Sequence, residues 1–175
     1  MTERTAQIRA ATPDDLDAVG RVHALSRQAA YVDLMPPDAL ARVTPERQAE
    51  VWRTRLASAP DPHAVHVAVV DGVVQGFVVG ETEGGTAQLV AIHTLPEQHG
   101  SGAGQALHDR LLADFAGWGC NTAELWVLEG NERAQSFYRR NGWTHDGTRK
   151  PHTVGGVVVP TLRYVRPVTS ATTRR

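Results

Sequence analysis

Residues 89–104 read Leu-Val-Ala-Ile-His-Thr-Leu-Pro-Glu-Gln-His-Gly-Ser-Gly-Ala-Gly, and this stretch decides the fold. Its apolar start predicts a strand, its proline predicts a turn, and its alternating glycines lead into a helix. Glycines let backbone N–H groups come close to a ligand, and a helix start adds unpaired donors and about half a positive charge. The stretch therefore predicts an anion site, most often a site for phosphate.

Two common phosphate loops do not match these glycines. A Walker A loop needs Lys and then Ser or Thr after its last glycine, whereas Gln105 and Ala106 follow Gly104. A dinucleotide loop reads G-x-G-x-x-G, whereas the glycines here stand at positions 100, 102 and 104. Glu129 follows the next strand as a ribose-binding acid would, but too few residues remain after it to complete a doubly wound sheet.

The rest of the chain predicts a mixed layer of helices and strands. Thr12-Pro13-Asp14-Asp15 and Thr44-Pro45-Glu46 each place a cap, a proline and acids at a helix start. The stretch around Met35-Pro36-Pro37 predicts a loop, and Asp71-Gly72 predicts a hairpin turn. Apolar residues at 103, 107, 111, 115 and 118 predict an amphipathic helix that joins two parallel strands. We expect strands at 7–11, 63–70, 73–81, 86–95, 123–128 and twice after 143, and helices from 16, from 44, over 103–118 and over 131–141.

Residues 125–143 carry the second informative motif, Leu-Trp-Val-Leu-Glu-Gly-Asn-Glu-Arg-Ala-Gln-Ser-Phe-Tyr-Arg-Arg-Asn-Gly-Trp. With the glycine loop, it resembles the GNAT superfamily of acyl-CoA-dependent N-acetyltransferases. That family's loop reads Q/R-x-x-G-x-G/A, and its later helix reads N-x-x-A-x-x-F-Y-x-x-x-G-F. The helix motif is matched, with Trp143 in place of the last Phe, by Asn131, Ala134, Phe137, Tyr138 and Gly142. The resemblance is strong over 87–146 and weaker over 7–85 and 148–167.

The resemblance implies the GNAT fold, of the α/β (α+β) class. This fold is a mixed, mostly antiparallel sheet of six to seven strands, flanked by about four helices. The sheet is expected to splay between its fourth and fifth strands, where a bulged strand ending near Thr94 diverges from 123–128. No repeat or linker divides the sequence, so we expect one domain over 1–168 and a flexible tail at 169–175.

The resemblance also implies acetyl-CoA as co-substrate. Pantetheine would lie in the gap, bound to backbone groups of Ile92 and Thr94, with the pyrophosphate on the glycine loop. His99 stands where the family has Arg or Gln, so a neutral imidazole would leave the phosphates to backbone donors. Asn131 is either a helix cap or a pantetheine contact, and the two roles can coexist. The expected cofactor-binding residues are Ile92, His93, Thr94, His99, Gly100, Ser101, Gly102, Ala103, Gly104, Asn131 and Tyr138.

For catalysis, the resemblance implies that an amine attacks the thioester and that Tyr138 protonates the leaving thiolate. The plain alternative for Tyr138 is a half-buried aromatic residue beside Phe137. Many relatives carry a Glu base at the position of Gln88, which cannot take up a proton. The candidates for the base are therefore Glu81, His93 or a path through water. By simple alternation His93 faces away from Gln88, unless a bulge reverses the phase.

The acceptor site is expected between the loop after the first helix, the second helix and the final hairpin. Its expected lining residues are Tyr31, Asp33, Met35, Trp52 and Trp126. The leading function is N-acetylation of a small-molecule amine or amino acid. One alternative is acetylation of a protein N-terminus or lysine. Another is a non-catalytic acyl-CoA-binding module with a regulatory role.

Net charge, cysteine content and apolar stretches argue against several other classes of protein. The net charge of −1 argues against a protein that coats nucleic acid or an anionic membrane. The single Cys120 gives no internal disulfide and no thiolate zinc site, and His63-x-x-His66 would point to opposite faces of a strand, so no metal is expected. No export signal and no apolar stretch long enough to cross a membrane occur, which predicts a cytoplasmic protein. A homodimer is common in the family.

Overall fold

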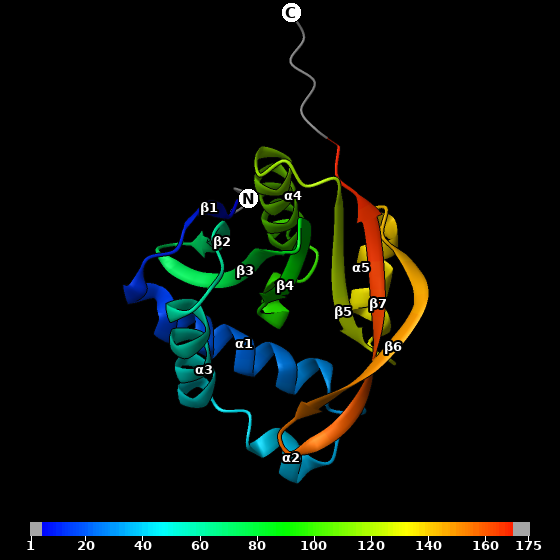
Figure 1. Cartoon of the computed structure of the whole chain (residues 1–175). Helices are drawn as coiled ribbons and strands as arrows, with labels where there is room; N and C mark the ends of the chain where they lie inside the picture. Colours follow the sequence, from blue (N-terminus) through cyan, green and yellow to red (C-terminus); the bar gives the residue numbers. More distant parts are fainter. Residues whose placement is uncertain (1–4, 170–175) are drawn as a thin grey trace, which may run out of the picture.

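A seven-stranded sheet in the order β1-β2-β3-β4-β5-β7-β6 forms the centre of the computed structural model, which describes residues 5–169 (Figure 1). All neighbouring strands are antiparallel except β4 and β5, which are parallel. This confirms the mixed, mostly antiparallel sheet. The strands are β1 (Gln7–Ala10), β2 (His63–Val70), β3 (Val73–Glu83), β4 (Thr86–Thr94), β5 (Thr122–Leu128), β6 (Thr144–Val154) and β7 (Val157–Pro167).

Five α-helices accompany the sheet, one more than the sequence predicts. They are α1 (Leu16–Ala30), α2 (Pro37–Ala41), α3 (Pro45–Ala57), α4 (Ala103–Gly117) and α5 (Glu132–Arg140), with short 3-10 helices η1 (Pro13–Asp15) and η2 (Pro96–Gln98). The prediction of a loop around Met35–Pro37 is wrong at its end, because α2 begins at Pro37. A proline is tolerated at a first helical position, where the missing N–H has no intrahelical partner.

The helices cover both faces of the sheet, and a core lies on each face (Figure 1). On one face, α1 and α3 pack over Val67, Phe77 and Val79. On the other face, α4 places its predicted stripe against Val78 and Leu125. At most 1% of the surface of Ala103, Leu107, Leu111 and Phe115 is exposed, which confirms the amphipathic helix.

Helices α1 and α3 approach one another closely at Gly20. A Cβ atom there would lie 2.5 Å from both the backbone nitrogen of Ala49 and the carbonyl oxygen of Pro45. No heavier residue fits without moving one helix. The contact holds α3 against α1, and both helices line the site described below.

A bulge in β4 changes which side chains share a face. Val79 pairs with Ala91 and Gly80 pairs with Leu89, so Val90 is an extra residue in β4. Side-chain alternation is therefore reversed beyond this point. Gln88 and His93 consequently face the same side of the sheet, the side covered by α1.

The predicted splay lies at the junction of β4 and β5. The two strands pair only through Ala87 with Ala123 and Gln88 with Glu124, near the start of each strand. Beyond these pairs the strands separate, although β4 continues to Thr94 and β5 to Leu128. The backbone of β4 is thus left facing a gap.

The remaining expectations concern the tail, the single domain, membrane spans and metal sites, and the structure describes residues 5–169 only. The tail predicted at 169–175 lies outside the described residues except for Thr169, and the single domain stays a prediction. Between residues 5 and 169, no helix is both long and apolar enough to cross a membrane. Within the same range, no group of three or more His, Cys, Asp and Glu residues is arranged to hold a metal ion.

Candidate active site

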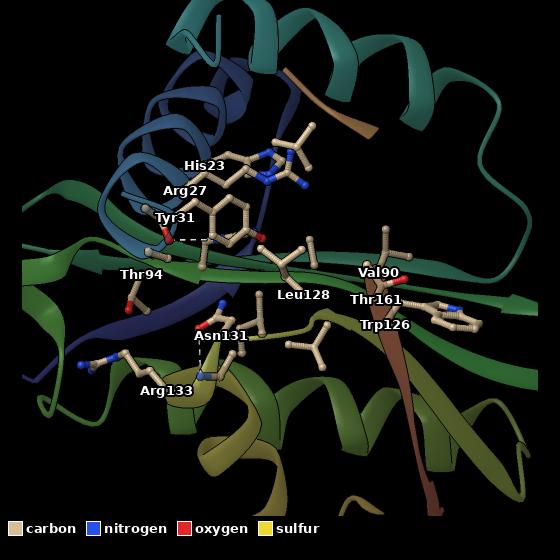
Figure 2. A pocket seen from close by; sticks show the side chains of 18 of the residues that line it. His23, Arg27, Tyr31, Val90, Thr94, Trp126, Leu128, Asn131, Arg133 and Thr161 are labelled. Atoms are coloured by element: carbon tan, nitrogen blue, oxygen red, sulfur yellow. Dashed lines mark hydrogen bonds between the residues drawn. The ribbon is translucent and has the colours of Figure 1, made fainter. Parts of the chain in front are cut away.

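A cavity of about 2090 Å³ opens where β4 and β5 separate (Figure 2). It is bounded by the glycine loop, α1, α3, α5 and the hairpin of β6 and β7. The loop after α1, the helix α3 and the final hairpin meet here, and these are the elements between which the acceptor site is expected. The volume exceeds the roughly 300–1,000 Å³ of a single small-ligand pocket, so it has room for a long cofactor and a second substrate.

The glycine loop reaches the cavity through conformations that favour glycine. Gly100 and Gly102 have φ values of +79° and +88°, and Gly102 is the N-cap of α4. His99 and Gly104 also line the cavity. Two expected residues do not belong to the lining. Ser101 accepts a hydrogen bond through its Oγ from the backbone N–H of Ala103 at 3.2 Å, and the side chain of Ala103 is buried against the core.

Positive charge near the loop comes from α5. Burial and the nearby charge of Arg133 lower the pKa of His99, against a smaller opposing effect of Glu97, so His99 is neutral at pH 7. Arg133 lines the cavity and forms no ion pair within residues 5–169 (Figure 2). Arg133 is not among the site residues expected from the sequence. Its position two residues after Asn131, at the start of a helix beside the gap, was the available signal.

Two backbone N–H groups of β4 face the gap. Leu95 donates its N–H to the carbonyl of Gln75 on the preceding strand, at 2.9 Å. Because N–H groups alternate between the two edges of a strand, those of Ile92 and Thr94 point to the other edge, towards β5. No β5 residue pairs with them, since the two strands have already separated.

Tyr138 and Asn131 lie on the α5 side of the cavity. The side chain of Tyr138 is buried, and this burial, with a smaller effect of Tyr31, raises the pKa of its hydroxyl above the ordinary value of 10. Its hydroxyl forms no hydrogen bond with the described residues, so a protonated O–H is available to the cavity. Asn131 caps α5 by accepting a hydrogen bond from the N–H of Ala134 at 3.3 Å, and it also lines the cavity (Figure 2).

Two carboxylates flank Gln88 in a row across three strands. Gln88 donates its amide N–H to Oε1 of Glu124 on β5 at 2.7 Å. On the other side it is opposite Glu81 on β3. Glu81 is paired with Arg55 at 2.7 Å, whereas the nearest cation to Glu124 is Arg163 at 3.7 Å. Glu124 is not among the site residues expected from the sequence, because the register of β4 and β5 fixes its partner.

His93 lies in the cavity wall between β4 and α1. Its Nδ1 is 2.9 Å from the hydroxyl of Ser26, and its ring centre is 4.6 Å from that of His23. Burial, and to a smaller degree the charge of Arg27, lower the pKa of His93 from 6.5 to about 3. The ring is therefore neutral at physiological pH.

Four of the five expected acceptor residues line the cavity: Tyr31, Asp33, Trp52 and Trp126. Trp52 forms part of the wall, since its indole N–H donates to Nδ1 of His23 at 2.9 Å and 3% of its surface is exposed. The placement of Met35 is a correction, because its side chain is buried in a core with Ala39 and Leu40 and is absent from the lining. Lys150 lies with its Nζ 4.0 Å from the centre of the Trp126 ring.

A parallel pair of strands that separates beside a glycine loop and a buried tyrosine defines an enzyme of the acyl-transferring class. A model described as the acetyltransferase (GNAT) family matches residues 28–143, and the chain belongs to this family. An uncharacterized N-acetyltransferase of Mycobacterium tuberculosis is 35% identical over 117 residues, which cover 61% of this chain and 74% of that protein.

Solved structures show the same fold. The PaiA N-acetyltransferase of Thermoplasma acidophilum, in complex with coenzyme A, has a TM-score of 0.73 at 18% identity, over 93% of this chain and 99% of that chain. YncA of Salmonella typhimurium, with its cofactor acetyl-CoA, has a TM-score of 0.66 at 16% identity, over 97% and 98%. At this identity the likeness concerns the fold alone.

Proposed function

We propose that this protein transfers the acetyl group of acetyl-CoA to a primary amine of a small molecule or amino acid by direct attack. One observation carries the proposal. The separation of β4 from β5 opens a cavity that runs from the glycine loop, past Tyr138, to the walls formed by α1, α3 and the final hairpin. The coenzyme A and acetyl-CoA in the structures of PaiA and YncA support the choice of co-substrate.

The residues present fit a long, anionic acyl carrier. Backbone N–H groups of Gly100, Gly102 and Gly104, at the start of α4, would hold its pyrophosphate, with Arg133 supplying positive charge. The free backbone groups of Ile92 and Thr94 would bind pantetheine as a neighbouring strand does. The amide of Asn131 is placed at the same gap, on the α5 side.

The chain can promote both halves of the transfer. Free N–H groups of β4 beyond the bulge polarise the thioester carbonyl and stabilise the oxyanion that forms when the amine attacks, an effect worth about 3–4 kcal/mol in other enzymes. The carbon–sulfur bond then breaks, and the hydroxyl of Tyr138 gives its proton to the leaving sulfur. General acids of this kind contribute roughly 10²–10⁴-fold to rate.

We assign removal of the amine's proton to Glu124, through a water molecule. His93 lines the same cavity, but its Nδ1 is engaged by Ser26 and its ring is packed against His23 and Phe77. Glu81 is engaged by Arg55, which competes with an incoming ammonium group. Glu124 accepts a hydrogen bond from a neutral amide, lies further from its cation, Arg163 at 3.7 Å, than Glu81 does from Arg55, and lines the cavity. His93 then acts as a wall that positions the acceptor.

Thiol release from acetyl-CoA, measured over small amines, amino acids and peptides, tests the proposal. Turnover on small amines or amino acids supports it, whereas turnover confined to peptides favours a protein acetyltransferase. Coenzyme A binding without turnover favours a binding module. Ligand at about 100 times its Kd adds about 2.7 kcal/mol of stability, or about 5–10 °C in Tm, so no shift with millimolar coenzyme A would overturn the proposal.

We also propose that the protein works in the cytoplasm as a homodimer, as is common in the family. Sedimentation equilibrium of the purified chain tests the second point directly, because monomer and dimer differ twofold in mass.

A further inference from the structure

His23 has a proton whose position is set by its neighbour. Trp52 donates its indole N–H to Nδ1 of His23 at 2.9 Å, deep between α1 and α3. An indole nitrogen can only donate, so Nδ1 is the acceptor and the proton of the neutral ring is on Nε2. Burial, followed by the charges of His93 and Arg27, lowers the pKa of His23 far below 6.5, so the ring is neutral at physiological pH.

The Nε2–H group of His23 is a buried donor without an acceptor in the described chain, and 4% of the residue's surface is exposed. Nε of Arg27, one helical turn further along α1, is buried and unpartnered in the same way. Residues four apart lie on one face of a helix. Figure 2 shows both side chains extending from α1 side by side, and both line the cavity.

The charge of Arg27 is also uncompensated. Among residues 5–169, no carboxylate forms an ion pair with it, and its guanidinium lies 6.0 Å from the centre of the Tyr31 ring. His93 on β4 and His152 on β6 both have lowered pKa values, chiefly through burial and further through the charge of Arg27. The groups around Arg27 are therefore neutral, and a positive charge faces the cavity.

Nε2–H of His23 and Nε–H of Arg27 need a hydrogen-bond acceptor, and the guanidinium needs a negative charge. Together they indicate which chemical group would bind here. A water molecule satisfies one donor but leaves the charge of the guanidinium in place. A carboxylate accepts several hydrogen bonds at once and brings the opposite charge. Among residues 5–169, no carboxylate is hydrogen-bonded or ion-paired to either donor.

We propose that His23 and Arg27 form a carboxylate subsite, so that the acceptor is an amino acid or another amine that carries a carboxylate. The inference rests on the proposed function. The ring of His23 lies 4.6 Å from that of His93 on β4, which places the subsite beside the strand that receives the thioester. The cavity also contains Glu81 and Glu124, so it offers negative charge for an ammonium group and positive charge for a carboxylate.

The test measures thiol release from acetyl-CoA over L-amino acids, each compared with its own carboxamide and its decarboxylated amine. For the best amino acid we expect kcat/KM to exceed that of both counterparts by at least about tenfold, the size expected of one charge-assisted contact. In Arg27→Gln this ratio should fall towards one, chiefly through KM. Arg21→Gln is the matched control, because Arg21 is on the same helix but outside the cavity lining, and it should keep the wild-type ratio.

A second readout separates this inference from the proposed function. Isothermal calorimetry of the same amino acid, with coenzyme A present, should show binding that weakens about tenfold in Arg27→Gln and less in Arg27→Lys. Equal use of amino acid, carboxamide and decarboxylated amine would overturn the subsite while leaving the acetyltransferase proposal intact. If no acceptor is turned over, the L-amino acids are titrated by calorimetry in turn. Binding that depends on Arg27 supports the subsite, and the absence of any binding rejects it.

Discussion

The amide of Gln88 donates a hydrogen bond to Glu124 at 2.7 Å, across the last residue pair that joins β4 to β5. A carboxylate thus stands at the closed end of the gap, on β5, one strand away from the position where many family members carry it. Because Gln88 holds Glu124 from the side, the base we propose has a fixed orientation, and its positive partner, Arg163, lies 3.7 Å away.

Exchanging these two side chains tests that arrangement. Glu124→Gln should lower kcat at least tenfold, because it removes the carboxylate that accepts the proton. A loss of this order is expected when a general base is removed. The double variant Gln88→Glu/Glu124→Gln keeps the pair and moves the carboxylate to β4, so it should recover part of the lost rate. Steady-state kinetics over pH 6–9 measures both. A Glu124→Gln variant with wild-type kcat would reject the assignment.

Replacing Tyr138 by Phe should lower kcat by about 10²-fold, because the leaving thiolate loses its proton donor. Since the Tyr138 hydroxyl makes no hydrogen bond to the described chain, Tm should change little. Coenzyme A should still raise Tm in the variant, which thermal melts with and without ligand measure. An unchanged kcat would show that another group protonates the sulfur.

The buried histidines should make stability depend on pH. His23 and His93 have folded-state pKa values below the 6.5 of an unfolded chain, that of His93 being about 3. The unfolded state then binds more protons, so the free energy of unfolding should fall as pH drops below about 6.5. The loss from His93 should approach about 2.5 kcal/mol by pH 4.5, two pH units below 6.5, since one pH unit corresponds to about 1.4 kcal/mol.

Urea unfolding between pH 4.5 and 7.5 measures this slope, and His93→Gln should flatten it. Asp15 does not interfere, because Arg9 holds its pKa at about 2, so its contribution is lost only below about pH 4. An identical slope in wild type and variant would show that His93 is protonated in the folded protein.

Gly20→Ala should destabilise the fold by about 1–3 kcal/mol, because the new methyl group would overlap the backbone of α3. The matched control is Gly117→Ala near the end of α4, where a Cβ meets nothing within 4 Å and helix propensity should add up to about 1 kcal/mol. Denaturant midpoints compare the two. Equal stability of Gly20→Ala and wild type would mean that α1 and α3 pack less closely.

The local features of the fold could be predicted from the sequence, whereas the contacts between distant segments could not. The glycines at 100–104 and the apolar stripe of α4 are local patterns, and both occur as expected. The bulge at Val90 leaves no mark in composition, yet it decides that His93 shares a face with Gln88. Glu124 becomes a site residue only through the register of β5 against β4.

The residues expected to line the acceptor site also show what the sequence alone could not predict. Tyr31 and Trp52 are aromatic residues that fit a core or a cavity equally well, and the sequence alone does not distinguish the two. The proton on Nε2 of His23 depends on a tryptophan 29 residues away along the chain. Patterns within one helix cannot report such a partner, so the donors of His23 and Arg27 emerge only from the folded chain.

Lys150, which lies over the Trp126 ring at the cavity wall, is the single lysine among 18 lysine and arginine residues. An enzyme that acylates amines can also acylate the amines of its own lysine side chains. Arginine side chains keep their proton and offer no nucleophilic amine at neutral pH. We therefore expect self-modification of lysine side chains at one nitrogen in the cavity wall, which intact-protein mass spectrometry would register as a single addition.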